Sequence, residues 1–339
     1  MGSSDLENIL IEYEQKRRNA EIDADLRKEK LYRDFPQIEK IENNINKLTI
    51  NKTKNILTNN INQNKEIEKR INELKLEKEK FIKINKIDYS VINPIYECDI
   101  CRDTGYIIKE NKKTEMCNCL KQRIFNISYN KSNLSNIKND SFENFNFKLF
   151  SDEVNVQKYK QKISPRKNIE NIKNASLEFI KNFDNPETKN LLFCGNTGLG
   201  KTYMSNAISL ELLKKGKTVL YQTAPVLLET VIDNKFNKYK NANINNFYND
   251  VLEADLLIID DLGTECLNSM KLSELFTILN TRILNLNNKV TRTIISTNLN
   301  IQQIFKTYEE RIGSRIAGYY DIYYFFGEDL RIKGRKVEK

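Results

Sequence analysis

The chain contains no histidine and no long apolar run. Without an imidazole group, Ser-His-Asp and Cys-His catalysis are excluded, and so is every metal site that needs a histidine ligand. No stretch approaches the roughly 18–20 consecutive apolar residues that span a bilayer, and we see no signal peptide at the start of the sequence. We therefore expect a protein that does not reside in a membrane.

Glycine and proline are almost absent from residues 5–90, where Pro36 is the single break. Apolar residues such as Leu6, Ile9 and Tyr13 recur at helical spacing among many Lys, Glu and Asn residues. This pattern predicts long amphipathic helices with charged outer faces, arranged as a helical hairpin or a coiled coil. The region is either an arm that docks on a partner or a solvated helical spacer.

Two close pairs of cysteines follow this region, separated by a short hairpin-like insert. Their C-x-x-C and C-x-C spacings match a structural zinc site with four thiolate ligands, which leaves no position open for catalysis. Because a nucleotide motif follows, we expect a reducing, cytoplasmic location, where such thiols bind metal rather than form disulfides. Four unligated thiols are the alternative. The predicted zinc ligands are Cys98, Cys101, Cys117 and Cys119.

Residues 191–202 read LLFCGNTGLGKT, which is an apolar run followed by G-x-x-x-x-G-K-T and then a helical pattern. A buried strand, a loop and a helix in this order bring backbone N–H groups and the helix dipole onto a phosphate group. We expect Lys201 to reach the β- and γ-phosphates and the Thr202 hydroxyl to bind Mg²⁺. A plain glycine-rich turn is the alternative. The predicted phosphate-binding residues are Gly195, Asn196, Thr197, Gly198, Leu199, Gly200, Lys201 and Thr202.

A second apolar run, at residues 254–261, ends in two aspartates. Four consecutive apolar residues predict a strand that is buried on both faces, and ligands bind at the carboxyl ends of parallel strands. Asp260 is predicted to hold the Mg²⁺ ion and Asp261 to orient the water that attacks the γ-phosphate. Since many such ATPases carry Glu at the second position, Glu265 is the alternative for this second role.

Further polar residues follow in the C-terminal part. Asn298 ends another predicted strand, where it either contacts the γ-phosphate or the attacking water, or caps the next helix. Arg311 and Arg315 share one face of a predicted helix. Because a neighbouring subunit often supplies an arginine to the transition state, we predict this role for Arg315, with Arg311 or a plain solvated helix face as alternatives. Arg331 is predicted to meet the phosphates.

The net charge of +9 favours polyanions such as nucleic acid, although Lys-rich solvated helices produce the same excess. Basic and aromatic residues alternate near the end of a predicted helix, which suits single-stranded DNA, where bases stack and lysines pair with phosphates. An ordinary amphipathic helix end is the alternative. These residues are Lys235, Phe236, Lys238 and Tyr239.

Taken in order, the phosphate loop, Asp260-Asp261, Ser-Thr-Asn298 and the ERIGSR segment at 310–315 resemble the AAA+ ATPases, and more narrowly the DnaC/DnaI replicative helicase loaders. The residues after Asn298 are too few for the usual AAA+ helical lid, as is typical of these loaders. The resemblance implies an α/β P-loop NTPase domain, with a parallel sheet flanked by helices and a truncated lid, after an α-helical region with a small zinc module.

The resemblance also implies a domain organisation. It comprises a helical helicase-docking arm at 1–95, a zinc module with four cysteine ligands at 96–122, a linker at 123–160 and the AAA+ ATPase domain at 161–339. The Phe-rich run 142–147 within the linker is alternatively a segment that packs against the next domain.

The function that the resemblance implies is ATP-dependent loading of a hexameric, DnaB-type replicative helicase onto single-stranded DNA at replication initiation. ATP or ADP, Mg²⁺ and Zn²⁺ are the implied cofactors, and the AAA+ domain is expected to self-associate. Asn298 corresponds to sensor 1, Arg315 to the arginine finger and Arg331 to sensor 2. An IstB-like transposition helper ATPase is the related alternative. A metabolic P-loop kinase, for which no basic lid is seen, and a scaffold with feeble ATPase activity are alternatives from other classes.

Overall fold

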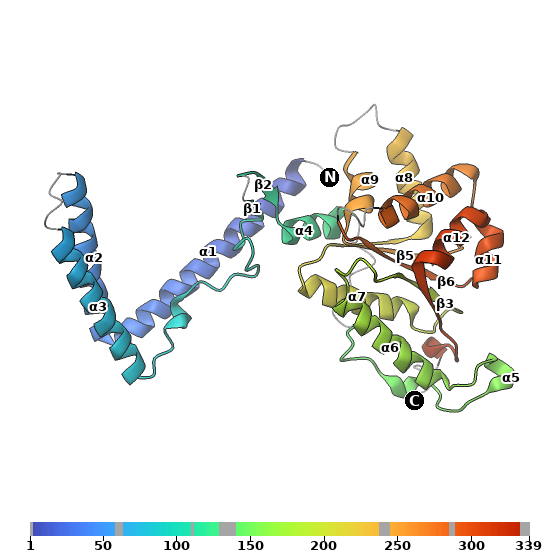
Figure 1. Ribbon diagram of the computed structural model, residues 1–339, viewed down its shortest axis with the longest axis horizontal. Coiled ribbons are helices and arrows are strands. Elements are labelled where there is room, and N and C mark those ends of the chain that lie inside the picture. Colours follow the sequence, from blue (N-terminus) through green and yellow to red (C-terminus); the bar gives the residue numbers. More distant parts are fainter. Residues whose placement is uncertain are drawn as a thin grey trace. The chain divides into compact units, whose positions relative to one another are not determined.

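The computed structural model describes residues 3–57, 64–109, 112–128, 140–236, 245–284 and 289–332. The chain divides into two compact units, which we call the N-terminal unit (Ser3–Glu115) and the C-terminal unit (Met116–Lys339). Figure 1 shows the helices of the first unit and the sheet of the second.

Long helices form the N-terminal unit, as the scarcity of glycine and proline predicts. They are α1 (Ser3–Asp34), α2 (Pro36–Leu57) and α3 (Asn64–Ile84). Pro36 is the first residue of α2, a position where its missing N–H group costs nothing. Helices α2 and α3 lie side by side (Figure 1). The apolar stripes of α1, α2 and α3 supply the buried residues of this unit, which include Ile9, Tyr13, Ala24, Leu31, Ile38, Ile41, Ile71 and Leu74.

A polar cluster centred on Glu42 ties the helices of the N-terminal unit together. The hydroxyl groups of Tyr32 and Tyr89 and the ammonium group of Lys78 all donate hydrogen bonds to the Glu42 carboxylate. Tyr89 begins the short 3₁₀ helix η2 (Tyr89–Ile92). Desolvation by burial acts to raise the pKa of Glu42, but the hydrogen bonds from these donors hold it below its ordinary value. The cluster therefore replaces apolar packing where α1, α2, α3 and η2 meet.

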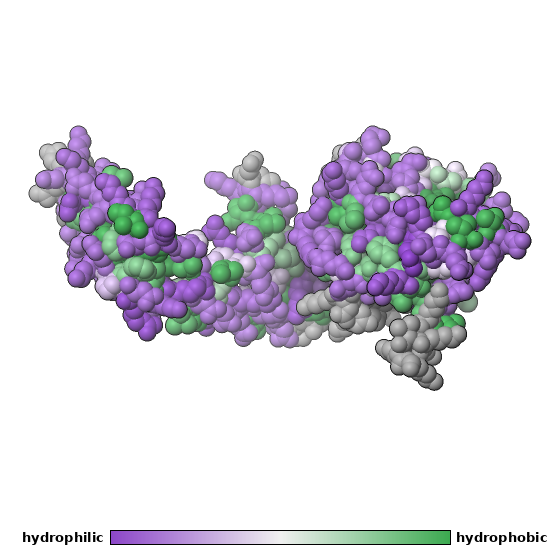
Figure 2. Space-filling model, turned by 90° about the horizontal axis from the view of Figure 1, so that it is seen from below, coloured by the Kyte–Doolittle hydropathy of each residue, from purple (hydrophilic) through white to green (hydrophobic). Residues whose placement is uncertain are grey.

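The surface of the N-terminal unit is mostly hydrophilic, as the predicted charged outer faces require, and apolar side chains interrupt it (Figure 2). Large apolar side chains that stand about half exposed include Ile11, Ile22 and Leu26 on α1, Ile50 on α2 and Leu76 on α3. Among the described residues, no helix combines the length and the apolar character that crossing a bilayer requires.

A small hairpin follows the helices. Its strands are β1 (Tyr106–Ile108) and β2 (Thr114–Met116), which form a two-stranded sheet within the described residues. The hairpin separates the two cysteine pairs in the sequence, as expected.

The C-terminal unit contains a parallel sheet with the strand order β4-β5-β6-β3-β7 in the described part of the chain. Its strands are β3 (Asn190–Cys194), β4 (Val219–Thr223), β5 (Leu256–Leu262), β6 (Arg292–Thr297) and β7 (Tyr320–Tyr324). Because both faces of the sheet are covered, β3 and β5 contain continuous apolar runs.

Helices cover both faces of this sheet (Figure 1). One hydrophobic cluster joins one face to α6 and α7, and a second cluster joins the other face to α8, α9, α10, α11 and α12. The helices of the unit are α4 (Asn118–Ser128), α5 (Val156–Tyr159), α6 (Pro165–Lys181), α7 (Lys201–Lys214), α8 (Ala224–Phe236), α9 (Asn245–Glu253), α10 (Ser269–Leu284), α11 (Ile301–Thr307) and α12 (Glu309–Tyr319).

Local capping follows the sequence signals in part. Ser164 caps α6 and Pro165 is its first residue, and Asn300 caps α11 through a capping box, as polar capping residues and a first-turn proline commonly do. The helical segment that begins after Asn300 is interrupted at Tyr308, which separates α11 from α12. Tyr308 is fully buried, so tertiary packing of its ring accounts for the break.

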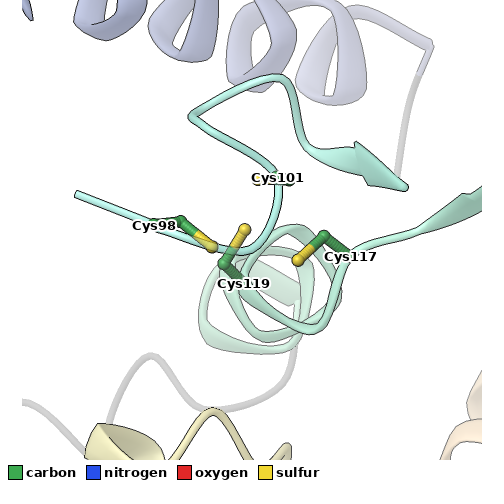
Figure 3. A group of neighbouring side chains, drawn as sticks. All are labelled: Cys98, Cys101, Cys117 and Cys119. Atoms are coloured by element: carbon green, nitrogen blue, oxygen red, sulfur yellow. The ribbon is translucent and has the colours of Figure 1, made fainter. Parts of the chain in front are cut away.

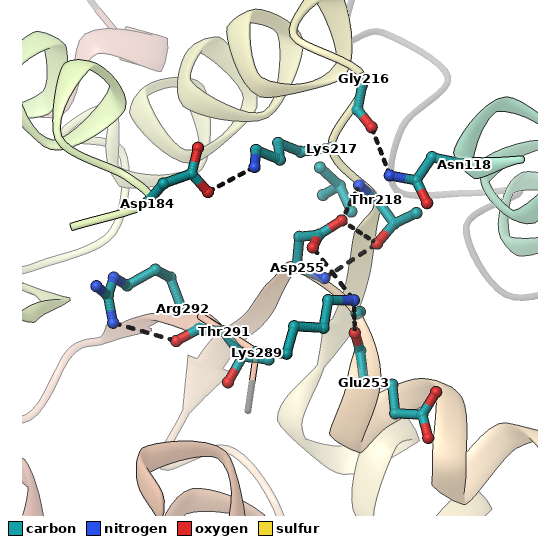
Figure 4. Close-up of polar contacts among 12 residues, drawn as sticks. Asn118, Asp184, Gly216, Lys217, Thr218, Glu253, Asp255, Lys289, Thr291 and Arg292 are labelled. Atoms are coloured by element: carbon teal, nitrogen blue, oxygen red, sulfur yellow. Dashed lines mark hydrogen bonds and ion pairs between the residues drawn. The ribbon is translucent and has the colours of Figure 1, made fainter. Parts of the chain in front are cut away.

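Helix α4 is attached to the edge strand β4. The side-chain amide of Gln122 accepts a hydrogen bond from Val219 N (2.6 Å) and donates one to Val219 O (3.0 Å). Asn118 Nδ2 donates to Gly216 O at 2.9 Å (Figure 4), and Phe125 is buried in the core beside the sheet. Helix α4 is thus an integral part of the C-terminal unit.

This attachment bears on the predicted domain boundaries at 95, 122 and 160. The structure divides the chain after Glu115, between the two cysteine pairs. Parts of the predicted linker 123–160 pack against the sheet, because Phe125, Phe142 and Phe150 are buried in its hydrophobic clusters.

A polar network joins the amino ends of β4 and β5 (Figure 4). The buried Asp255 carboxylate accepts hydrogen bonds from Thr218 N and Thr218 Oγ1, both at 2.7 Å, and pairs with Lys289 at 3.2 Å. Desolvation acts to raise the pKa of Asp255, but these hydrogen bonds and the lysine charge hold it below its ordinary value. The network fixes the start of the edge strand at the end of the sheet opposite the phosphate loop.

Candidate nucleotide-binding site

The loop between β3 and α7 has the backbone conformation that its glycines predict. Gly198 and Gly200 have φ angles of 77° and 92°, in the left-handed region that residues with a Cβ atom adopt poorly. A Cβ atom on Gly198 would also lie 2.0 Å from an Asp329 carboxylate oxygen. Helix α7 begins at Lys201, so the loop residues precede the positive end of its dipole.

Lys201 is the first residue of α7, and its largely buried side chain reaches back to the loop. Its ammonium group donates to the carbonyl oxygens of Gly195 and Asn196 and, at 2.9 Å, to Asn298 Oδ1. Burial lowers the pKa of Lys201, while the carboxylates of Asp261 and Asp260 oppose that shift. The end of β6 thus places Asn298 directly beside the lysine, as expected for neighbouring parallel strands.

A cavity of about 480 Å³ opens above this loop. Its polar side is formed by the loop from Thr197 through Thr202, together with Asp261 and Arg331. Leu330 N donates to Gly198 O at 2.9 Å, which holds the segment carrying Arg331 against the loop. The cavity therefore combines backbone N–H groups, a lysine, an arginine and a carboxylate, the groups that a triphosphate requires.

The other side of the cavity is apolar. It is lined by Phe145, Leu149, Phe150, Tyr203 and Leu330. Phe145 stacks on Phe150, with ring centroids 5.9 Å apart and an interplanar angle of 12°. The segment around Phe145 belongs to the predicted linker, for which the sequence predicts no role in the site. The Phe-rich run at 142–147 was the one available signal.

Asp260 and Asp261 diverge at the end of β5. The pairing of β5 with β6 is irregular between Ile259 and Leu262, and Asp261 has a φ of 54°. As a consequence Asp260 is buried, whereas Asp261 is exposed and lines the cavity. Desolvation and the neighbouring Asp260 charge raise the pKa of Asp261, and Lys201 and Arg331 limit the rise.

The residues predicted to hold Mg²⁺ lie together. Thr202 Oγ1 donates to Asp260 Oδ2 at 3.3 Å. A hydroxyl and a carboxylate are the hard oxygen ligands that Mg²⁺ prefers, so this pair fits the ion.

Glu265, the alternative to Asp261, points into the protein. One of its carboxylate oxygens accepts a hydrogen bond from the Tyr308 hydroxyl and the other accepts one from Gly263 N at 2.9 Å. Glu265 does not contribute to the cavity lining described above. The geometry therefore favours Asp261 over Glu265 for contact with a phosphate-bound water.

Arg311 and Arg315 lie on α12, away from the cavity of their own chain. The Arg311 guanidinium is 5.0 Å from the Phe276 ring centroid and pairs with Glu309. The Arg315 guanidinium lies 5.8 Å from the Tyr319 ring centroid. Within one chain, the structure does not bring either arginine to the predicted phosphate site.

The four cysteines of the predicted zinc site lie together (Figure 3). The sulfur atoms of Cys98, Cys101, Cys117 and Cys119 are all within 4.8 Å of one another. Zinc–sulfur bonds of about 2.3 Å in a tetrahedron place sulfur atoms about 3.8 Å apart, so this cluster fits a zinc ion. The Asp103 carboxylate accepts hydrogen bonds from the backbone N–H groups of Glu97 and Cys98, which shapes the first cysteine turn.

The predicted basic and aromatic strip at the end of α8 is only partly described. Lys235 pairs with Glu274 at 2.5 Å. Lys238 and Tyr239 lie outside the residues that the structure describes.

The parallel sheet, the phosphate loop and the paired aspartates define an AAA+ P-loop nucleotide-binding protein. Residues 122–313 match the model of a family described as IstB-like ATP binding protein. This match covers more than half of the chain, and the chain belongs to that family.

Related proteins take part in replication. The replicative helicase loader DnaC of Buchnera aphidicola subsp. Baizongia pistaciae is 34% identical over 91 residues, which are 27% of this chain and 36% of that protein. The chromosomal replication initiator protein DnaA of Buchnera aphidicola subsp. Cinara cedri is 38% identical over 104 residues, which are 30% of this chain and 22% of that protein. The chain thus spans about a fifth to a third of the length of these relatives.

Among solved structures, the crystal structure of DnaI aligns with 56% of this chain and 93% of that chain. The two share 23% sequence identity, and the TM-score is 0.43.

Proposed function

We propose that this protein is an ATP-dependent loader that binds the hexameric, DnaB-type replicative helicase and delivers it to single-stranded DNA at replication initiation. The observation that carries the proposal is the convergence of Lys201, Asp261 and Arg331 on one cavity, in a chain with DnaC among its relatives. The separate helical unit supports it, because a loader needs a surface for its helicase besides the nucleotide site.

ATP binds with its phosphates on the loop at 195–202 and its base on the apolar side of the cavity. Lys201, Asn298 and Arg331 contact the phosphates, and Asp261 orients the attacking water. Thr202 and Asp260 would hold Mg²⁺, which when bound neutralises charge on the phosphate oxygens. The raised pKa of Asp261 brings its proton affinity closer to that of a general base at neutral pH.

Two copies of the chain share each active site in this proposal. Arg315 lies on the surface helix α12, away from its own cavity. Self-association places it at the nucleotide of a neighbouring copy, where it stabilises transition-state charge. ATP then stabilises the assembly and hydrolysis releases the helicase.

Nucleotide binding and hydrolysis by the full chain test the enzymatic part. Lys201→Ala is expected to abolish ATP binding, since it removes the charge from the phosphate site. Asp261→Asn is expected to retain ATP binding but to hydrolyse ATP about 100-fold more slowly, the order of a general base contribution. Normal ATP affinity in the Lys201→Ala variant, measured by calorimetry, would overturn the site assignment.

Co-purification with the replicative helicase hexamer of the same organism tests the loader part. The full chain should co-elute with the helicase in size-exclusion chromatography, and a chain lacking residues 1–115 should not. Loading is then measured as helicase bound to single-stranded DNA coated with its binding protein. Helicase that neither co-elutes with the full chain nor loads faster in its presence contradicts this function.

An IstB-like transposition helper is the second candidate, favoured by the family match at residues 122–313. It predicts that the protein stimulates a cognate transposase and leaves helicase loading unchanged. The two assays, run side by side on the same preparation, separate the candidates.

A further inference from the structure

Asp260 is buried beneath the nucleotide cavity, and two hydroxyl groups from neighbouring strands hold its carboxylate. The Tyr221 hydroxyl, from β4, donates to Oδ2 at 2.5 Å. The Ser296 hydroxyl, from β6, donates to Oδ1. Because β4 and β6 lie on opposite sides of β5, the carboxylate accepts hydrogen bonds from both neighbouring strands.

The Tyr221 ring and its hydroxyl have separable roles. The ring belongs to the hydrophobic cluster that joins the sheet to α6 and α7, and only 2% of the residue is exposed. A phenylalanine ring would fill the same space. The hydroxyl contributes a hydrogen bond whose acceptor is Asp260, and a buried hydroxyl requires such a partner. Nothing in the strand pattern around residue 221 points to this contact, since it depends on the register of β4 and β5, in which Tyr221 pairs with Ile258, two residues before Asp260.

Ser296 connects the two aspartates. Besides donating to Asp260, its oxygen accepts a hydrogen bond from Asp261 N at 3.1 Å. Asp261 N also lies 3.1 Å from Asp260 Oδ1. Ser296 therefore supports the left-handed backbone at Asp261 that separates the directions of the two carboxylates.

We propose that Tyr221 and Ser296 are positioning residues that fix the Asp260 carboxylate beside Thr202, and that they thereby set how tightly the nucleotide site takes Mg²⁺. The inference rests on the proposed ATPase function, in which Asp260 and Thr202 hold the ion. Groups that orient a metal ligand through hydrogen bonds commonly change metal affinity 10- to 100-fold when they are removed.

The test uses the full chain and a fluorescent ADP analogue, with affinity measured in EDTA and across a titration of MgCl₂. Tyr221→Phe and Ser296→Ala should each bind the analogue in EDTA with the wild-type affinity. The Mg²⁺ concentration that gives half of the affinity gain should rise about tenfold in each variant. Hydrolysis measured at rising Mg²⁺ should shift in the same direction.

Tyr308→Phe is the matched control. Tyr308 is likewise buried and donates to a carboxylate, that of Glu265, away from the cavity lining. This variant should lose comparable thermal stability while keeping the wild-type Mg²⁺ midpoint.

The outcomes separate the inference from the function on which it rests. An unchanged Mg²⁺ midpoint in both site variants overturns the inference alone, and so does an equal loss of affinity with and without Mg²⁺, which indicates a packing role. A wild-type protein whose nucleotide affinity does not respond to Mg²⁺ overturns the metal site itself. Ser296→Ala keeps the test decisive if Tyr221→Phe does not fold.

Discussion

At the scale of residues, Arg315 makes a specific prediction, because it lies outside its own nucleotide cavity. Arg315→Ala should bind ATP normally but hydrolyse it about 1000-fold more slowly, the lower range for an arginine finger. Mixing it with Lys201→Ala should restore activity. The Arg315→Ala copy supplies an intact nucleotide site, and the Lys201→Ala copy supplies the arginine. The measurement is phosphate release from the mixture.

Arg311→Ala is the control for this experiment and should retain most of the activity, because Arg311 is engaged by Phe276 and Glu309. A mixture no more active than its separate components contradicts a role for Arg315 in a neighbouring copy.

Short motifs pointed to the residues that gather in one loop or at adjacent strand ends. Lys201, Asn298, Thr202 and Asp260 were each picked out by such motifs, and the fold brings them together because a strand leads into a helix beside parallel strands. Tyr221 and Phe145 were missed for a physical reason. Their places depend on strand register and on how a long connecting segment packs, and neither is encoded in local spacing.

At the scale of elements, apolar runs predicted the buried strands well, because parallel strands covered on both faces need continuous apolar residues. The break between α11 and α12 was not predictable in this way. Neither glycine nor proline marks it, and the buried Tyr308 that occupies it is held by its contact with Glu265, far away in sequence.

At the start of the edge strand β4, the hydrogen bonds of Asp255 predict an effect on stability. Asp255→Ala leaves Thr218 N and Thr218 Oγ1 without their carboxylate acceptor and removes the ion pair of Lys289, so the variant should lose about 3 kcal/mol of unfolding free energy at pH 7. The measurement is urea denaturation of the two proteins, and Asp255→Asn, which keeps the size of the side chain, should lose less.

The pH dependence of this loss follows from the lowered pKa of Asp255. A carboxylate whose pKa is depressed by folding contributes stability above its unfolded pKa of about 3.9, and this contribution disappears as the pH falls through the folded value. The difference between wild type and variant should therefore be smaller at about pH 3, below the unfolded pKa, than at pH 7. A difference that grows on acidification contradicts the assignment.

At the scale of the whole molecule, the cysteine cluster predicts one zinc ion per chain. Cys98→Ser combined with Cys117→Ser should abolish the zinc found by metal analysis of the purified protein. ATP binding should persist, because the cavity is lined by residues 140–331, whereas co-elution with the helicase should weaken.

Cys266→Ser is the matched control, since Cys266 is exposed and lies outside the cluster. That variant should keep its zinc. Wild-type protein that contains no zinc after purification without chelators rules out the metal site.

The division of the chain after Glu115 could not be read from the cysteine spacing. The spacing groups the cysteines into one module, whereas Gln122 and Phe125 attach α4 to the sheet. Whether a helix belongs to the unit before or after it depends on such contacts between residues far apart in the sequence.

The amide of Gln122 also has a consequence for assembly. β4 is one of the two edge strands of the described sheet, and such a strand normally offers free peptide groups to any extended segment that approaches it. At Val219 both groups are already satisfied by the chain's own glutamine. A strand from another molecule would have to displace α4 before it could pair with β4 at Val219. Copies of the protein are therefore expected to join through helical surfaces and not by strand pairing at this edge.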